Sequence, residues 1–140
     1  MNEQWLREFE HTGDLGIEVT APSRGELFRR AAIAMASAMV DAAGVVKREN
    51  REIQIAAISD TDLMHDALRK LLEAFMIDGF IWSEVAVEEE PHGLKLRLWG
   101  ETYDLRRHEF RTEIKAVTYH EIAVTQQKDS NWRTRIIFDV

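Results

Sequence analysis

Two segments of the chain, residues 23–40 and about 60–78, carry apolar residues at the three- and four-residue steps of an amphipathic helix. Ser23 stands three residues before Glu26, which is the spacing of a capping box, where each side chain accepts a hydrogen bond from a backbone N–H of the first turn. Gly79 follows the second segment, and glycine readily adopts the left-handed conformation that ends helices. These features predict two helices, each with one broad apolar face.

Most of the remaining chain shows the two-residue alternation of β-strands. Leucines at 94, 96 and 98 alternate with Lys95, Arg97 and Trp99, and the sequence EEEPHG before them is typical of a hairpin tip. The predicted strands are residues 5–9, 17–21, 52–57, 81–87, 94–99, 111–119, 122–125 and 132–139. The pattern indicates one α+β domain spanning residues 1–140, with two amphipathic helices packed on a mostly antiparallel β-sheet.

The composition narrows the function classes. The formal net charge is −7, so we expect no tight binding of nucleic acid by this protein alone, and an acidic surface suits a protein partner or a cation site. The chain has no cysteine, which excludes disulfides and thiolate zinc sites. No apolar run approaches about 20 residues and the first residues resemble no secretion signal, so we expect no membrane span and a cytoplasmic protein.

The last predicted strand places Arg133, Arg135, Ile137 and Asp139 on one face. Asp139 is followed by Val140, whose terminal carboxylate adds a second negative charge. Adjacent carboxylates repel each other unless a cation or strong hydrogen-bond donors neutralise them. Arg135 stands two residues back on the same face, and the local sequence favours a salt bridge from it to Asp139.

Asp14 lies between Gly13 and Gly16 in the sequence EHTGDLGI, where the backbone can turn tightly. An Asp in a turn often bonds only its own backbone. If Asp14 instead meets Asp139 in space, the two side chains and the chain end form an all-oxygen site. Such a site suits a hard cation such as Ca²⁺, Mg²⁺ or Mn²⁺.

The segment RTEIKAVTYH, residues 111–120, would place Glu113 and Lys115 on a regularly charged strand face. That face is either a solvated ladder of paired charges or a binding surface. The basic turn DLRRH, residues 104–108, either contacts a phosphate or is simply solvated. We expect His65 and His92 on the surface. The five histidines show no metal-ligand spacing, and we find no complete catalytic constellation.

Four stretches together resemble the archease family: HTGDLGI, LFRRAAIAMASAMVD, GETYDLRRHEFRTEIKAVTYH and the final FDV. The resemblance implies a small α+β protein that is not an enzyme but an accessory factor of the RtcB-type RNA ligase. That ligase joins RNA ends in tRNA splicing and RNA repair, using GTP and a divalent metal. The accessory factor would promote ligase guanylylation and multiple turnover.

The same resemblance assigns roles to individual residues. It implies a divalent cation, Ca²⁺ or Mg²⁺/Mn²⁺, bound by Asp14, Asp139 and the main-chain oxygens of Val140. It also implies a functional role for Glu113 and Lys115. The chain departs from the family pattern at Gly13, where Ala is usual, and in the second helix.

Two alternatives stay open at the level of sequence. The first is a small metal-dependent hydrolase or nucleotide enzyme, in which Asp14 and Asp139 hold the metal and His11 serves as a base. The second is a chaperone-like binding module, in which the cation only fastens the chain end to the first loop.

Overall fold

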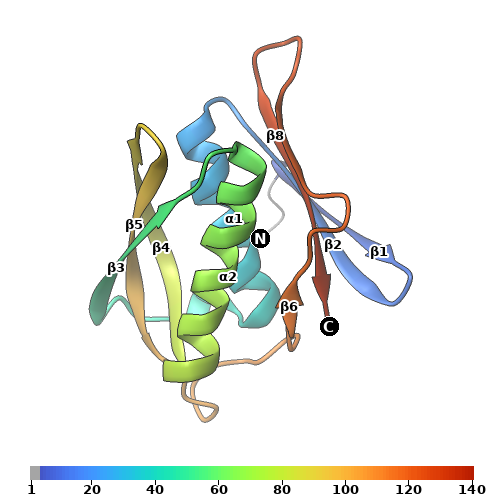
Figure 1. The fold of residues 1–140 in the computed structure, drawn as a ribbon. Helices are drawn as coiled ribbons and strands as arrows, with labels where there is room; N and C mark the ends of the chain where they lie inside the picture. Colours follow the sequence, from blue (N-terminus) through green and yellow to red (C-terminus); the bar gives the residue numbers. More distant parts are fainter. Residues whose placement is uncertain (1–3) are drawn as a thin grey trace.

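A computed structural model of the protein describes residues 4–140, apart from the side chain of His11. The elements in chain order are β1 Leu6–His11, β2 Asp14–Ala21, α1 Arg24–Met39, the 3-10 turn η1 Ala42–Gly44, β3 Glu49–Ala56, α2 Asp60–Asp78, β4 Phe80–Glu90, β5 Gly93–Thr102, β6 Ala116–Val117, β7 Ala123–Gln126 and β8 Trp132–Asp139 (Figure 1). In the described part of the chain, no helix is long and apolar enough to span a membrane.

Local signals fix the ends of both helices. Ser23 caps α1, and its Oγ accepts a hydrogen bond from the Glu26 N–H at 3.2 Å. The Glu26 carboxylate does not return the bond that a full capping box requires, because it accepts from Arg29 and Arg30 instead. Helix α2 has the predicted bounds, and Gly79 ends it with φ +70°. The predicted helices are therefore confirmed, with half of the predicted capping box.

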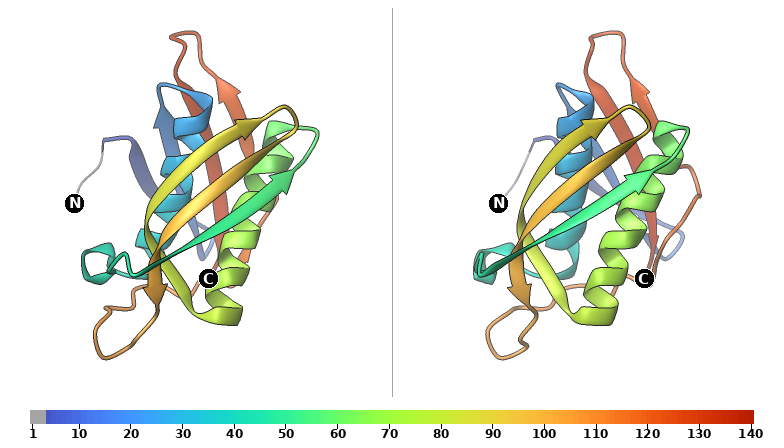
Figure 2. Two further views of the ribbon diagram at one scale, coloured as in Figure 1. Left: turned by 90° about the vertical axis from the view of Figure 1, so that its left-hand side faces the viewer. Right: turned by 60° about the vertical axis from the view of Figure 1, so that its left-hand side comes forward.

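The strands form two antiparallel sheets rather than one. One sheet has the order β1-β2-β8-β6, with β7 also pairing β8, and the other has the order β3-β5-β4. Both helices lie between the sheets (Figure 1), and Figure 2 shows the three-stranded sheet in front of them. The α+β class is confirmed, whereas the expected single sheet is replaced by two sheets with the helices between them.

Helix α1 explains this layout, because it is buried on more than the one predicted face. Its buried residues include Ala32, Ala34 and Ala36 in addition to the predicted apolar stripe. Alanine side chains are short, so a sheet can approach each side of the helix. Trp82 of β4 is fully buried, and its Nε1 donates a hydrogen bond to the carbonyl of Ala32 at 3.0 Å. This bond fastens the three-stranded sheet to the helix.

The predicted strand over residues 111–119 is wrong, because only Ala116–Val117 pairs with β8. Residues 103–115 cross instead from the three-stranded to the five-stranded sheet (Figure 1). Ile114 and Val117 are both buried, although strict alternation would put them on opposite faces. We call residues 103–115 the crossing segment. The packing of its ends, rather than strand pairing, determines where Glu113 and Lys115 lie.

Candidate functional site at the end of β8

The register of the five-stranded sheet brings Asp14 and Asp139 side by side. Strands β2 and β8 pair as far as Leu15 opposite Phe138, so one further step sets Asp14 opposite Asp139. Opposed residues in antiparallel strands have Cα atoms about 4.5–5.5 Å apart and share a face. We call Asp14 and Asp139, with the adjoining Val140, the carboxylate row. His11 pairs with Asp14 in the ladder and so lies next in the row, but its side chain is outside the described residues.

The two carboxylates have no ion-pair partner within the described part of the chain. Arg135, which the local sequence assigns to Asp139, points elsewhere. Its guanidinium carbon lies 4.1 Å from the centroid of the Phe9 ring, and its Nε lies 3.6 Å from Glu121 Oε1. The predicted salt bridge is therefore absent. Like charges directly opposite each other destabilise a sheet, so this arrangement would be stabilised by a bound cation.

The donors of the carboxylate row fit a hard divalent cation. Asp14 and Asp139 supply carboxylate oxygens, and Val140 supplies main-chain oxygens. Oxygen ligands of this kind suit Ca²⁺, Mg²⁺ or Mn²⁺, and water would fill the remaining positions. No group of three or more His, Cys, Asp or Glu side chains suited to a metal occurs among the described residues. A cation here would thus depend on the main chain of Val140 as well as on the two side chains.

Phe9 and Gly16 shape the sheet face next to the row. A Cβ built on Gly16 would meet ring atoms of Phe9 at 2.3 Å, so Gly16→Ala must displace the ring. We expect this change to cost about 1–3 kcal/mol of unfolding free energy, as overpacking usually does. In a Phe9→Ala background the same change should cost little. Chemical denaturation of wild type, the two single variants and the double variant measures the coupling energy between residues 9 and 16. An equal cost in both backgrounds would contradict the contact.

Glu113 and Lys115 reach the same end of the sheet through the crossing segment. Both are exposed and flank the buried Ile114. The backbone N–H of Lys115 donates a 2.7 Å hydrogen bond to the carbonyl of Asp139, which joins the segment directly to the carboxylate row. The sequence left open a ladder of paired charges here. Within the described residues, neither Glu113 nor Lys115 forms an ion pair.

His65 also holds this region, and the expectation that it lies on the surface is wrong. It is 6% exposed, and its Nε2 donates a 3.0 Å hydrogen bond to the carbonyl of Val117 in β6. The ring stacks on Tyr119 with centroids 3.6 Å apart. Partial desolvation, with Asp66 and Asp62 nearby, raises the pKa of the Tyr119 hydroxyl. Helix α2 thereby fixes β6 beside β8.

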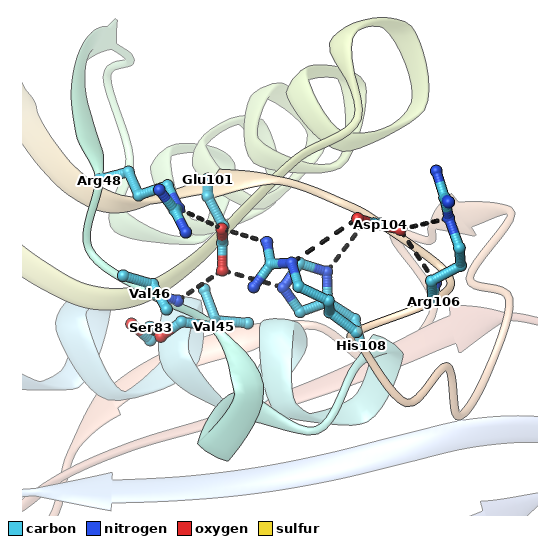
Figure 3. Close-up of polar contacts among 9 residues, drawn as sticks. Val45, Val46, Arg48, Ser83, Glu101, Asp104, Arg106 and His108 are labelled. Carbon is cyan, nitrogen blue, oxygen red and sulfur yellow. Dashed lines mark hydrogen bonds and ion pairs between the residues drawn. The ribbon is translucent and has the colours of Figure 1, made fainter.

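The start of the crossing segment is anchored on a buried carboxylate, Glu101, at the end of β5 (Figure 3). Glu101 is 2% exposed. It accepts hydrogen bonds from Arg107, from the Val46 N–H at 2.6 Å, from His108 Nε2 at 2.9 Å and from Arg48 Nε at 3.1 Å. Burial alone would raise the pKa of this carboxyl, but the donors, Arg107 foremost, outweigh burial and lower the pKa to about 2. Glu101 is therefore charged.

His108 completes this anchor in its neutral form. Its Nδ1 accepts a 2.8 Å hydrogen bond from the backbone N–H of Asp104, so the ring proton is on Nε2, which donates to Glu101. Arg107 and His108 of the basic turn 104–108 thus bind a carboxylate of the same chain, whereas the Arg106 side chain of this turn is exposed. The network holds the beginning of the segment that carries Glu113 and Lys115.

The chain is similar to known proteins over nearly its whole length. The model of the Archease protein family matches residues 6–140. Among curated proteins, the chain is 35% identical over 137 residues to the protein archease of Methanopyrus kandleri, covering 95% of this chain and 97% of that one. It is 32% identical over 142 residues to the protein archease of Pyrococcus abyssi, covering 99% of each chain.

A solved structure has the same fold. The solution structure of Methanobacterium thermoautotrophicum protein 1598 superposes with a TM-score of 0.79 at 28% sequence identity. The match covers 99% of this chain and 100% of the other. The similarity therefore extends over both sheets and the helices between them.

Proposed function

Because the chain belongs to the archease family, we propose that it is an accessory protein that activates the GTP-dependent RtcB-type RNA ligase in tRNA splicing and RNA repair. In this proposal it promotes ligase guanylylation and multiple turnover and is not itself the enzyme. The observation that carries the proposal is the carboxylate row, where Asp14 and Asp139 stand opposite each other without a cationic partner in the described part of the chain. Such a pair suits presentation of a cation to a partner.

In the proposal, Asp14, Asp139 and the main-chain oxygens of Val140 hold one divalent cation, Ca²⁺ or Mg²⁺/Mn²⁺. A bound divalent cation offsets negative charge on phosphate oxygens during phosphoryl transfer. The protein's own residues keep these oxygen donors together through the β2–β8 register. The bond from Lys115 to Asp139 keeps the exposed Glu113 and Lys115 beside them.

The charge balance favours a protein partner over direct binding of RNA. The net charge of −7 opposes tight binding of nucleic acid by this chain alone. Several arginines are also paired with acids, such as Arg24 with Asp60 and Arg133 with Glu18. The ligase would therefore hold the RNA, and the two proteins would work together in the cytoplasm.

Addition of the pure protein to a multiple-turnover RNA joining assay with the cognate ligase tests the proposal. We expect substoichiometric protein to raise the number of ligations per ligase, together with the rate at which GMP labels the ligase. A Glu113→Ala, Lys115→Ala double variant, changed only at exposed positions, should fold normally and activate at least about tenfold less. Unchanged ligase turnover at every ratio of wild-type protein would refute the proposal.

One observation keeps a second candidate function in view. His11 pairs with Asp14, so a histidine, two carboxylates and the proposed cation would lie in one row, as in a small metal-dependent hydrolase. Incubation of the pure protein with nucleoside triphosphates and Mn²⁺ discriminates between the two. Hydrolysis that disappears in His11→Ala would favour the enzyme, whereas an accessory protein should release no phosphate.

A further inference from the structure

Beside Glu113 and Lys115 lies a hollow with apolar walls. Its volume is about 310 Å³, and its lining residues are Phe75, Met76, Phe110, Glu113, Ile114 and Lys115. This volume is at the small end of binding pockets, which span about 300–1,000 Å³. We call it the α2 hollow, because the last turns of α2 form one wall and the crossing segment forms the other.

The walls of the α2 hollow are held in place from behind. Tyr103 makes edge contacts with the rings of both Phe75 and Phe110, with centroids 5.9 and 6.0 Å apart. Ile114 forms a buried wall at 3% exposure. Met76 and Phe110, by contrast, are 60% and 45% exposed, although each adds a large apolar side chain to the hollow. The hollow is therefore preformed, and its apolar rim is open to a partner.

The two charges at its edge, Glu113 and Lys115, have no ion-pair partner in the part of the chain that the structure describes. Glu113 and Lys115 both line the α2 hollow, and neither forms an ion pair within the described residues. Several other surface charges are paired, for example Arg51 with Asp78 at 2.8 Å. An apolar hollow with one free acid and one free base at its edge complements a segment with an apolar anchor between a basic and an acidic residue.

We propose that the α2 hollow is the docking site for a segment of the partner RNA ligase that inserts an apolar side chain between a base facing Glu113 and an acid facing Lys115. This inference rests on the proposed function and adds the surface through which it works. The hollow is continuous with the carboxylate row, because the Lys115 N–H is bonded to the Asp139 carbonyl. A segment seated in the hollow therefore brings the row against the ligase.

Met76→Asp tests the docking site, because a charge at this exposed position blocks an apolar anchor without disturbing the core. Ile77→Asp is the matched control, since Ile77 is the next residue, is 78% exposed and lines a different hollow, beside Glu52 and Lys70. Titration of each protein into the cognate ligase by calorimetry gives the affinity, and the joining assay gives the concentration for half-maximal activation.

We expect Met76→Asp to lower the affinity for the ligase, and to raise the concentration for half-maximal activation, by at least about tenfold each. Ile77→Asp should stay within about twofold of wild type. Saturating Met76→Asp should restore most of the maximal activation, because the carboxylate row is intact. Glu113→Lys should also weaken binding, and this loss should shrink as salt rises.

The outcomes separate this inference from the function on which it rests. Activation by wild type with equal affinity of Met76→Asp and Ile77→Asp would overturn the docking site and leave the activator function standing. Wild-type protein that neither binds nor activates the ligase would overturn both. If sedimentation shows that wild type is a dimer and that Met76→Asp is a monomer, the hollow binds a second copy of the chain. That result would also overturn the inference.

Discussion

Replacing Glu101 with alanine is expected to lower the free energy of unfolding by about 3 kcal/mol. The carboxylate is 2% exposed and accepts hydrogen bonds from Arg107, His108 and the Val46 N–H. Alanine would leave these donors without their acceptor. Arg107 and Arg48 are partly exposed, so water can hydrate them once the carboxylate is gone. We therefore expect a loss of stability at the lower end of the range for breaking a buried ion pair. Chemical denaturation followed by circular dichroism measures the change.

Glu52 supplies the matched control. It lies on the neighbouring strand β3 and is exposed, with Lys95 at 3.5 Å and Arg97 at 3.8 Å. Loss of such surface pairs costs less than about 1 kcal/mol, so Glu52→Ala should remain near wild type. Equal losses in the two variants would show that the buried network does not hold the crossing segment.

The same carboxylate gives this prediction a pH signature. Its pKa is about 2 in the folded protein, against 4.5 for an unperturbed group, so the unfolded chain binds its proton first as pH falls. The stability contributed by Glu101 is therefore complete above about pH 4.5 and is lost as pH falls toward 2. The stability difference between wild type and Glu101→Ala should be constant from pH 6 to about pH 5 and narrow below that range. A constant difference down to pH 3 would contradict the assignment.

Asp139→Asn is expected to reduce the affinity for a divalent cation by at least about tenfold, with the fold intact. Substitution of residues that hydrogen-bond to metal ligands typically lowers metal affinity about 10–100-fold, and loss of a ligand itself should lower it at least as much. Asparagine keeps the size of the side chain and removes one of the two opposed charges. Titration calorimetry with Ca²⁺, Mg²⁺ and Mn²⁺ measures the affinity, and Asp14→Asn should behave in the same way.

Thermal unfolding gives an independent measure of this prediction. Binding of the proposed cation to the folded state should raise the melting temperature of wild type, and Asp139→Asn should lose that rise. Without cation, Asp139→Asn should be at least as stable as wild type, because it relieves like-charge repulsion. Glu10→Gln is the control, because Glu10 pairs with Leu15 and so faces away from the carboxylate row. A cation response that Asp139→Asn retains, or that Glu10→Gln loses equally, would rule out the row as the site.

Residues close together in the chain determine the parts of the fold that could be predicted. Ser23 and Gly79 mark helix ends because a hydroxyl reaches an N–H three residues away and glycine tolerates positive φ. The alternation in 132–139 likewise predicts the extent of β8. That alternation also places Asp139 and Arg135 on one face, but it does not indicate which neighbour the Arg135 guanidinium contacts. In the structure the guanidinium lies over the ring of Phe9, on β1, and not beside Asp139.

The crossing segment shows where local pattern misleads. The alternation over residues 111–119 is that of a strand, yet only Ala116–Val117, just after the crossing segment, pairs with β8. Its position depends on Glu101 and His65, which lie in β5 and α2. No periodicity in the sequence marks these two residues. Glu101 meets His108, seven residues on, only because the turn 104–108 folds back, and His65 meets Val117, which is 52 residues away. For the same reason, the sequence suggested a surface position for His65.

The sequence by itself determined the two helices, most of the strands and the α+β class. Only the tertiary structure decided that two sheets enclose the helices, that the β2–β8 register sets the two carboxylates opposite each other, and that Glu113 and Lys115 border an apolar hollow. The physical reason is separation along the chain, because helix caps and hydrophobic periodicity depend only on residues a few positions apart. Register, burial and charge pairing depend instead on which distant segments pack together.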